Sequence, residues 1–167
     1  MTTIRQARPE DEPRLRDIDA ATWTADASPA PLPSADAAFF GERITAANVL
    51  VAETGRVIAG YAALGQSLPL ASHSHVLDIR GLAVHPALQR CGVGHRLVEA
   101  CIEQARSRGA RKLSLRVLGG NDAARRLYEL CGFTVEGVLS DEFFLGGRYV
   151  DDVLMAFGVD AIAGPGR

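Results

Sequence analysis

The pattern of apolar and polar positions predicts mostly strands in the first half of the chain and alternating helices and strands in the second half. Runs with strand character span residues 3–7, 49–53, 56–63, 76–84, 112–117, 134–138 and 150–157. Segments with helical spacing begin at residues 9–12 and span 35–47, 94–108 and 122–131. This order predicts an α/β protein in which helices cover both faces of a central mixed sheet.

Three of these segments show clear burial patterns. The segment 94–108 repeats apolar residues at spacings of three and four, with charged residues elsewhere, as expected for a helix with one buried face. Strand 76–84 is almost continuously apolar after Asp78, which predicts burial on both faces. The first helix should turn three residues inward, Leu15, Ile18 and Ala21.

Length and composition indicate one globular domain over residues 1–158, with a flexible tail over 159–167. Hydrophobic residues make up 47% of the chain, and its net charge of −2 lacks the basic excess of a nucleic-acid or membrane-surface protein. No apolar run approaches the ~20 residues that span a bilayer, and the polar N-terminus has no signal-peptide core. Cys91, Cys101 and Cys131 lack metal-ligand spacing and suit a reducing compartment. We expect a cytoplasmic protein without a metal, and we leave open whether it forms a homodimer.

The most informative segment links strand 76–84 to the next helix and reads LAVHPALQRCGVG. Its spacing Q-x-x-G-x-G differs from both the Walker and the dinucleotide-binding glycine patterns. The first turn of a helix has unpaired N–H groups and a partial positive charge, so it binds phosphate oxygens. Gly92 and Gly94 lack the Cβ atoms that would hold a diphosphate away from this backbone. We interpret the segment as a diphosphate-binding turn, and a plain strand–helix connection is the alternative.

A second motif, GGNDAARRLYELCGF, follows the strand at 112–117 and contains Asn121, Tyr128 and Gly132-Phe133. The two motifs, in this order and separation, resemble the acyl-CoA site of the Gcn5-related N-acetyltransferases (GNAT). The resemblance covers roughly the whole chain and is strongest from Val76 to Phe157. It implies that family's fold, acetyl-CoA as cosubstrate and acetyl transfer to an amine.

The resemblance also implies roles for particular residues. The strand before the turn should splay from its neighbour and offer backbone groups of Leu82, Ala83 and Val84 to the pantetheine arm and the thioester carbonyl. Tyr128 matches a tyrosine near the CoA sulfur, where a phenol of pKa about 10 can protonate or hydrogen-bond a thiolate of pKa about 8.5; packing against the sheet is the alternative. Asn121 matches a residue that bonds the pantetheine arm, and it can also cap a helix. The turn and helix start comprise Gln89, Arg90, Cys91, Gly92, Val93, Gly94 and His95.

The motifs do not fix the residue that deprotonates the amine. Several family members carry a glutamate on the strand before the Asn motif, but here that strand reads LSLRV and Arg116 stands at the matching position. Asp78 lies where other members carry an acid on the central strand, and we take it as the candidate base. The alternatives are Glu53, His75 or an ordered water chain, with Asp78 then a structural carboxylate paired with Arg80 or Arg116.

The end of the chain, EGVLSDEFFLGGRYVDDVLMAF, resembles the tail of acetyltransferases that act on amino acids and other small amines. We predict an N-acetyltransferase that transfers the acetyl group of acetyl-CoA directly to a primary amine of a small molecule or peptide. A non-catalytic acyl-CoA-binding sensor on the same fold is the alternative. The acids near this end are expected to be solvated or to attract a cationic acceptor; they are Asp141, Glu142, Asp151 and Asp152.

Overall fold

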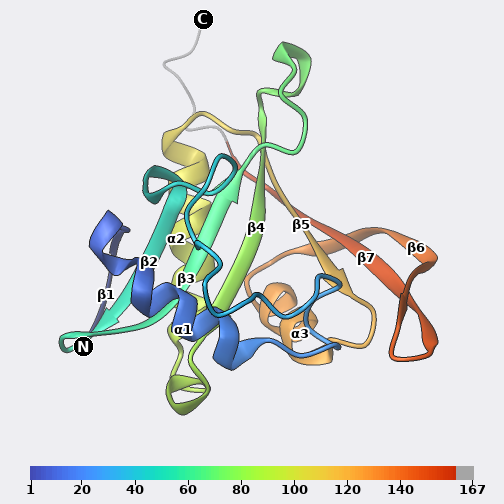
Figure 1. Ribbon diagram of the computed structural model, residues 1–167. Coiled ribbons are helices and arrows are strands. Elements are labelled where there is room, and N and C mark those ends of the chain that lie inside the picture. The colour runs from blue at the N-terminus through green and yellow to red at the C-terminus, as the bar shows by residue number, and fades with distance from the viewer. Residues whose placement is uncertain (161–167) are drawn as a thin grey trace, which may run out of the picture.

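The computed structural model describes residues 1–160, and a seven-stranded mixed sheet forms its centre (Figure 1). The strand order is β1-β2-β3-β4-β5-β7-β6, in which the pair β4 and β5 is parallel and the other neighbouring pairs are antiparallel. The strands are β1 (Thr2–Gln6), β2 (Val49–Thr54), β3 (Val57–Gly65), β4 (Val76–Val84), β5 (Lys112–Leu118), β6 (Thr134–Leu145) and β7 (Arg148–Gly158).

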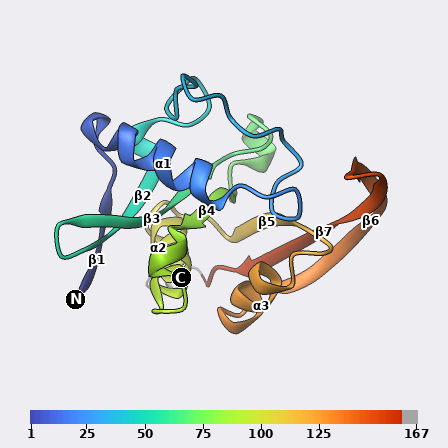
Figure 2. The same ribbon diagram turned by 60° about the horizontal axis from the view of Figure 1, so that its bottom comes forward.

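Helices cover both faces of this sheet, which confirms the predicted fold class. Helix α1 (Glu12–Thr22) lies on one face, and α2 (Val93–Ser107) and α3 (Asp122–Leu130) lie on the other (Figure 2). The apolar side of α2 is buried as its spacing predicts, with Leu97, Val98, Cys101, Ile102 and Ala105 inside.

Each face of the sheet has its own hydrophobic core. On the face of α2 and α3 the core includes the fully buried Leu97, Leu113 and Met155. On the face of α1, Leu15 and Ile18 join residues of β2 and β3. The central strands are therefore buried on both sides, which explains their almost continuous apolar sequence.

Strands β4 and β5 pair over only part of their length. Val76–Ile79 pairs with Lys112–Leu115, and beyond this point the strands diverge (Figure 1). On the other edge of β4 the register with β3 shifts at the same level, which leaves Arg80 as an extra, bulged residue. A bulge bends the strand that carries it. The structure thus contains the splayed strand that the family resemblance implies, and we call the opening between β4 and β5 the fork.

The helix predicted over residues 35–47 is wrong. The segment is irregular apart from a short 3-10 turn at Ala46–Asn48. Phe39 and Phe40 pack against the core on the α1 face, and their N–H groups donate to Glu12 Oε1 at 2.9 and 3.2 Å. These contacts with α1 outweigh the local helical preference, because propensity is worth only a few tenths of a kcal/mol per residue.

Three smaller expectations also need correction. Ala21, predicted to point inward, is exposed. Strand β6 continues to Leu145 because it pairs along nearly the whole of β7. Val159, predicted to begin a flexible tail, is buried and donates its N–H to Arg111 O at 2.9 Å. Residues 161–167 of that tail lie outside the described part of the chain.

Among the helices of residues 1–160, none is long and apolar enough to cross a membrane.

Gly60 provides a test of how tightly β3 holds the bent half of β4. A Cβ at this position would lie 2.6 Å from Ala83 O and 3.1 Å from Val84 Cα. We expect Gly60→Ala to destabilise the protein by about 1–3 kcal/mol, the usual cost of overpacking, as measured by denaturant unfolding. The control is Gly137→Ala on β6, where the added Cβ would meet Leu154 Cδ1 at an ordinary 3.7 Å. Equal stability of the two variants would contradict a tight β3–β4 contact.

Candidate active site

The fork gives the second half of β4 a free edge. From Gly81 to Val84 the strand pairs with β3, and no strand within residues 1–160 pairs with its other edge. The N–H of His85 donates to Ala59 O on β3 at 2.8 Å, so the alternation of the strand directs the N–H groups of Leu82 and Val84 into the fork. This edge can hydrogen-bond an extended chain or a carbonyl oxygen, as expected for Leu82–Val84.

The predicted turn forms an open set of N–H groups at the start of α2. Gln89 Nε2 donates to Val84 O at 2.9 Å, which ties the turn to the end of β4. Arg90 (φ 60°) and the N-cap residue Gly92 (φ 80°) have left-handed backbone conformations. The N–H groups of Arg90, Cys91 and Gly92 make no hydrogen bond within the described chain. Together with the first turn of α2 they form a group of free donors of the kind that binds anions.

Glycine is required at the two positions of the turn for different structural reasons. A Cβ on Gly92 would meet no atom within 4 Å, so this residue is needed for its positive φ and leaves the N–H groups open to a ligand. A Cβ on Gly94 would lie 3.1 Å from Leu127 Cδ2. Gly94 therefore also permits close packing of α2 against α3, a structural role that the sequence did not predict.

Tyr128 lies in the core between α3 and the sheet and is 7% exposed. Its ring packs against Phe133, with centroids 5.7 Å apart. Burial raises the pKa of Tyr128 far above its ordinary value of about 10, with smaller contributions from Cys101 and Cys131. The phenol therefore stays protonated at neutral pH. Its hydroxyl makes no hydrogen bond within residues 1–160, so it remains a donor for a ligand.

Asn121 is the N-cap of α3, and its Oδ1 accepts a hydrogen bond from Ala124 N at 3.2 Å. The capping role is thus present in the structure. The side-chain NH2 group is not used by this cap and remains available to a ligand.

Asp78 stands at the closed end of the fork, directly opposite Ser114 of β5. Its Oδ2 accepts hydrogen bonds from the N–H and the hydroxyl of Ser67, both at 2.7 Å, and its Oδ1 accepts one from the Ser114 hydroxyl. The expected alternative partners, Arg80 and Arg116, do not contact it. Asp78 therefore connects the β3–β4 loop to the point where the fork begins.

Arg116 follows at the level where β5 leaves β4, and it pairs with Asp152 of β7 and, at 3.7 Å, with Glu142 of β6. The Asp152 carboxylate is 3% exposed, which corrects the expectation of a solvated acid on a hairpin. Sequence reasoning missed this pair because the two residues are far apart in the chain. The alternation of Arg116 with its apolar neighbours Leu115 and Val117 is the signal that could have placed this arginine on a polar face of the sheet.

The other candidate bases do not reach the fork. Glu53 lies on β2, two strands from β4, and forms an ion pair with Arg5 at 2.8 Å. His75 precedes β4 at the end remote from the turn, where its carbonyl accepts hydrogen bonds from the N–H groups of Arg111 and Lys112.

His95, expected near the phosphates, contacts Cys131 and Glu99 with its ring nitrogens.

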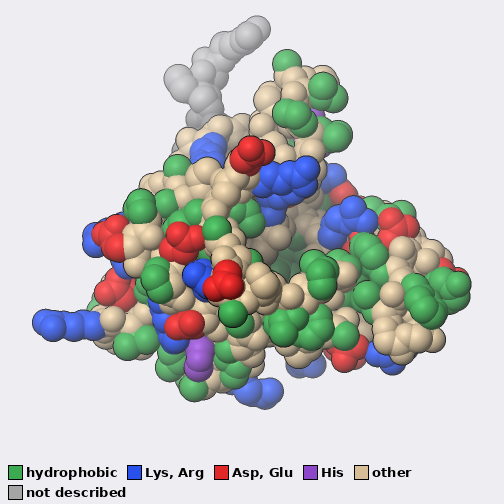
Figure 3. Space-filling model, viewed as in Figure 1, with side chains coloured by type: hydrophobic (Ala, Val, Ile, Leu, Met, Phe, Trp, Pro, Cys, Tyr) green, Lys and Arg blue, Asp and Glu red, His purple; other side chains and the backbone are tan. Residues whose placement is uncertain are grey.

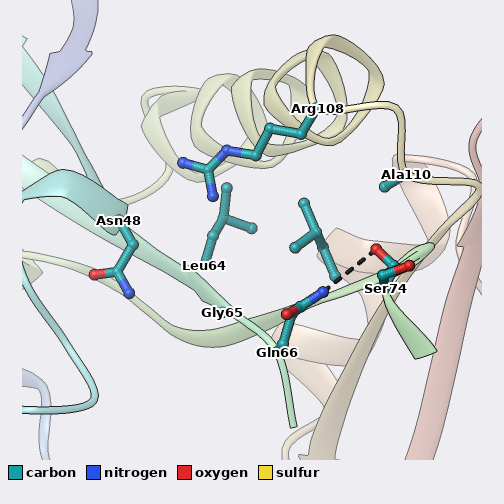
Figure 4. Close-up of a pocket in the computed structure, with 8 residues that line it drawn as sticks. Asn48, Leu64, Gly65, Gln66, Ser74, Arg108 and Ala110 are labelled. Atoms are coloured by element: carbon teal, nitrogen blue, oxygen red, sulfur yellow. Dashed lines mark hydrogen bonds between the residues drawn. The ribbon is translucent and has the colours of Figure 1, made fainter. Parts of the chain in front are cut away.

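The surface is hollowed over the fork, and Lys or Arg side chains lie at the rim of the hollow (Figure 3). A separate cavity of about 300 Å³ lies at the opposite end of α2 from the turn (Figure 4). Gln66 bridges part of its wall through a hydrogen bond to Ser74 O at 3.3 Å. None of the expected cofactor residues lines it, so we assign the chemistry to the fork.

The sequence model of the Acetyltransferase (GNAT) family matches residues 12–133. The chain belongs to this family.

Individual relatives agree with this assignment. The L-methionine sulfoximine/L-methionine sulfone acetyltransferase of Salmonella typhimurium is 31% identical over 117 residues, which are 70% of this GNAT chain and 68% of that protein. The L-amino acid N-acyltransferase MnaT of Escherichia coli is 29% identical over 112 residues, 67% of this chain and 64% of that protein. The structure of yncA from Salmonella typhimurium, solved with its cofactor acetyl-CoA, has a TM-score of 0.80 at 26% identity and covers 99% of this chain and 98% of that one.

Fold, family and relatives thus confirm the predicted activity. The protein is an N-acetyltransferase of the GNAT family.

The assignment of the turn to the cofactor can be tested at Gly92. We expect Gly92→Asp to weaken acetyl-CoA binding about tenfold or more, because a carboxylate beside the N–H groups repels phosphate. Gly109→Asp at the other end of α2 is the control, since Gly109 also has a positive φ (73°) and open space around it. Calorimetry that gives the same affinity for both variants would remove the diphosphate from this turn.

Proposed function

We propose that the fork and the turn together bind acetyl-CoA in an extended form. The N–H groups of Arg90–Gly92 and of the first turn of α2 hold the diphosphate. The free edge of β4 at Leu82–Val84 pairs with the pantetheine arm and the thioester carbonyl, and the Asn121 amide donates to the same arm. The observation that carries this proposal is the unpaired β4 edge leading directly into an unpaired helix start.

In this geometry the amine attacks the thioester carbonyl directly, without an acyl-enzyme. The carbonyl oxygen becomes an oxyanion, which a fixed backbone N–H of β4 stabilises. Tyr128 donates a hydrogen bond or its proton to the departing CoA sulfur. Its raised pKa favours hydrogen bonding over complete proton transfer, because the phenol is then a weaker acid.

We propose Asp78 as the group that receives the proton of the amine, directly or through one water. Its three hydrogen bonds do not prevent this, because the Ser114 hydroxyl can rotate from donor to acceptor when the carboxylate becomes protonated. An amine of pKa about 10 lies ~3 units above neutral pH, so about 4 kcal/mol of deprotonation must be met.

We propose a small primary amine, such as the amino group of an amino acid, as the acceptor. The names of two relatives, which act on methionine sulfoximine or on L-amino acids, support this class. We further propose that the reaction needs no metal and takes place in the cytoplasm, which is consistent with three free cysteines.

One observation favours the alternative of an acyl-CoA sensor. Arg116, paired with Asp152, stands at the position where the family resemblance implies a glutamate. Turnover of acetyl-CoA with a panel of amino acids and amines separates the two proposals. Tight acetyl-CoA binding without acetylation of any amine would favour the sensor.

Tyr128→Phe tests the role of the phenol. We expect kcat to fall about 10²–10⁴-fold with little change in acetyl-CoA binding. In the native enzyme, ionisation of Tyr128 should cause no loss of rate up to about pH 9, because burial raises the pKa of this phenol above its ordinary value. Tyr149→Phe, at an exposed tyrosine of β7, is the control. A native kcat for Tyr128→Phe, measured where chemistry limits the rate, would reduce Tyr128 to a packing residue.

Asp78→Asn tests the base. We expect kcat/KM to fall most at neutral pH and to recover partly at high pH, where the free amine is abundant. Ser67→Ala is the matched control, since it removes one donor to Asp78 and keeps the carboxylate. It should lower the melting temperature without changing the shape of the pH profile. If Asp78→Asn also changes only stability, Asp78 is a structural link and not a base.

A further inference from the structure

Three side chains on the α2–α3 side of the molecule form a chain of contacts. Cys131, which ends α3, has its Sγ 3.2 Å from His95 Nδ1 in the first turn of α2. The other ring nitrogen, His95 Nε2, lies 3.3 Å from Glu99 Oε1, one turn further along α2. A thiol beside an imidazole whose second nitrogen faces a carboxylate is the arrangement of an activated nucleophile. We propose that Cys131 exchanges with small disulfides, with His95 as its base and Glu99 as the residue that orients His95.

Glu99 determines which nitrogen of His95 can act. A carboxylate only accepts hydrogen bonds, so Glu99 favours the neutral tautomer that carries its proton on Nε2. The lone pair of Nδ1 then faces the Cys131 thiol. Glu99 therefore acts through His95, as a positioning residue.

The thiol needs such a base. Burial, and to a smaller extent the negative charge of Glu99, raise the pKa of Cys131 to about 11. Free thiolate is scarce at neutral pH, so His95 must take the proton as the sulfur attacks. The resulting imidazolium lies between the sulfur and the Glu99 carboxylate, where its positive charge is stabilised.

The backbone around Cys131 favours disulfide exchange over acyl transfer. Acyl transfer produces an oxyanion that needs free N–H donors. The N–H groups of Cys131, Gly132 and Phe133 are all bonded to carbonyls of α3, at 3.0–3.2 Å. Disulfide exchange forms no oxyanion and does not need them.

The exchange balances without any other reactant. The Cys131 S–H bond breaks and its proton moves to His95 Nδ1. The sulfur forms a new S–S bond with one half of the small disulfide, whose own S–S bond breaks. The departing thiolate then takes the proton from His95 and leaves as a thiol.

The two other cysteines are internal references for this reactivity. Cys91 is exposed and Cys101 is buried, and neither has a hydrogen-bonding base within residues 1–160. Burial raises the pKa of Cys101 to about 12. We expect Cys101 to be inert and Cys91 to react as an ordinary exposed thiol.

The experiment measures labelling by 4,4′-dithiodipyridine, an uncharged disulfide, at neutral pH, with each cysteine followed by peptide mass spectrometry. Cys131 should be labelled in the native fold, and His95→Gln should slow it about tenfold or more, as for loss of a general base. The rate of Cys91 in the same sample corrects for general changes. Labelling of Cys131 at the same rate in His95→Gln, or no labelling before unfolding, would overturn the proposal.

Glu99→Gln separates orientation from simple charge. If Glu99 orients His95, this variant slows the labelling of Cys131. If Glu99 acts only through its negative charge, its removal lowers the pKa of the thiol and labelling becomes faster, which would contradict the proposed role. Glu103→Gln is the matched control one turn along the same helix, where the carboxylate pairs with Arg106 instead; it should leave the rate unchanged.

Discussion

The divergence of β4 from β5 is the constraint on which the rest of this structure depends. A parallel pair normally continues its hydrogen bonds along both strands, and unpaired backbone groups are costly when they are buried. Here the bulge at Arg80 bends β4 away while the opposite edge of the strand stays paired with β3 up to Val84. The close approach of Gly60 to the backbone of Ala83 and Val84 keeps that half of β4 in place. The fork is therefore preformed, and its free N–H groups can pair with a ligand.

The same strand also positions the anion site. Because Gln89 bonds the last carbonyl of β4, the turn and the start of α2 cannot move independently of the fork. Gly94 then allows α2 to pack closely on Leu127 of α3, the helix that carries Tyr128. The donors that we propose for the diphosphate and the thioester therefore belong to one connected unit with the Tyr128 phenol. Such a unit favours the fixed donor geometry that electrostatic catalysis requires.

Local sequence predicted most helices and strands of this unit correctly. It failed where contacts with residues distant in the chain determine the structure. The apolar spacing of α2 and the run of β4 predicted both elements almost to the residue, because burial alone determines these patterns. The helix over 35–47 was wrong because Glu12, far away in the chain, binds the N–H groups of Phe39 and Phe40. The partners of Asp78 were wrong for the same reason, since Ser67 and Ser114 reach it only through the sheet. The packing role of Gly94 was not predicted, because a sequence does not show which helix will pack against a glycine.

The ion pairs of Arg116 reduce the electrostatic repulsion that this side chain would exert on a positively charged amine acceptor. A cation on β5 would repel an incoming ammonium if it were unpaired, since two like charges 4 Å apart interact by about 4 kcal/mol near a protein surface. Asp152 on the neighbouring strand β7 and Glu142 on β6, the next strand along, compensate that charge. The glutamate that the family resemblance implies on β5 is absent, and these two carboxylates lie beside the arginine that stands in its place. Asp78, the carboxylate that we propose as the base, takes no part in the pairing of Arg116, because it bonds Ser67 and Ser114 instead. The proton transfer proposed for Asp78 and the charge compensation at Arg116 are therefore separable features of one face of the sheet.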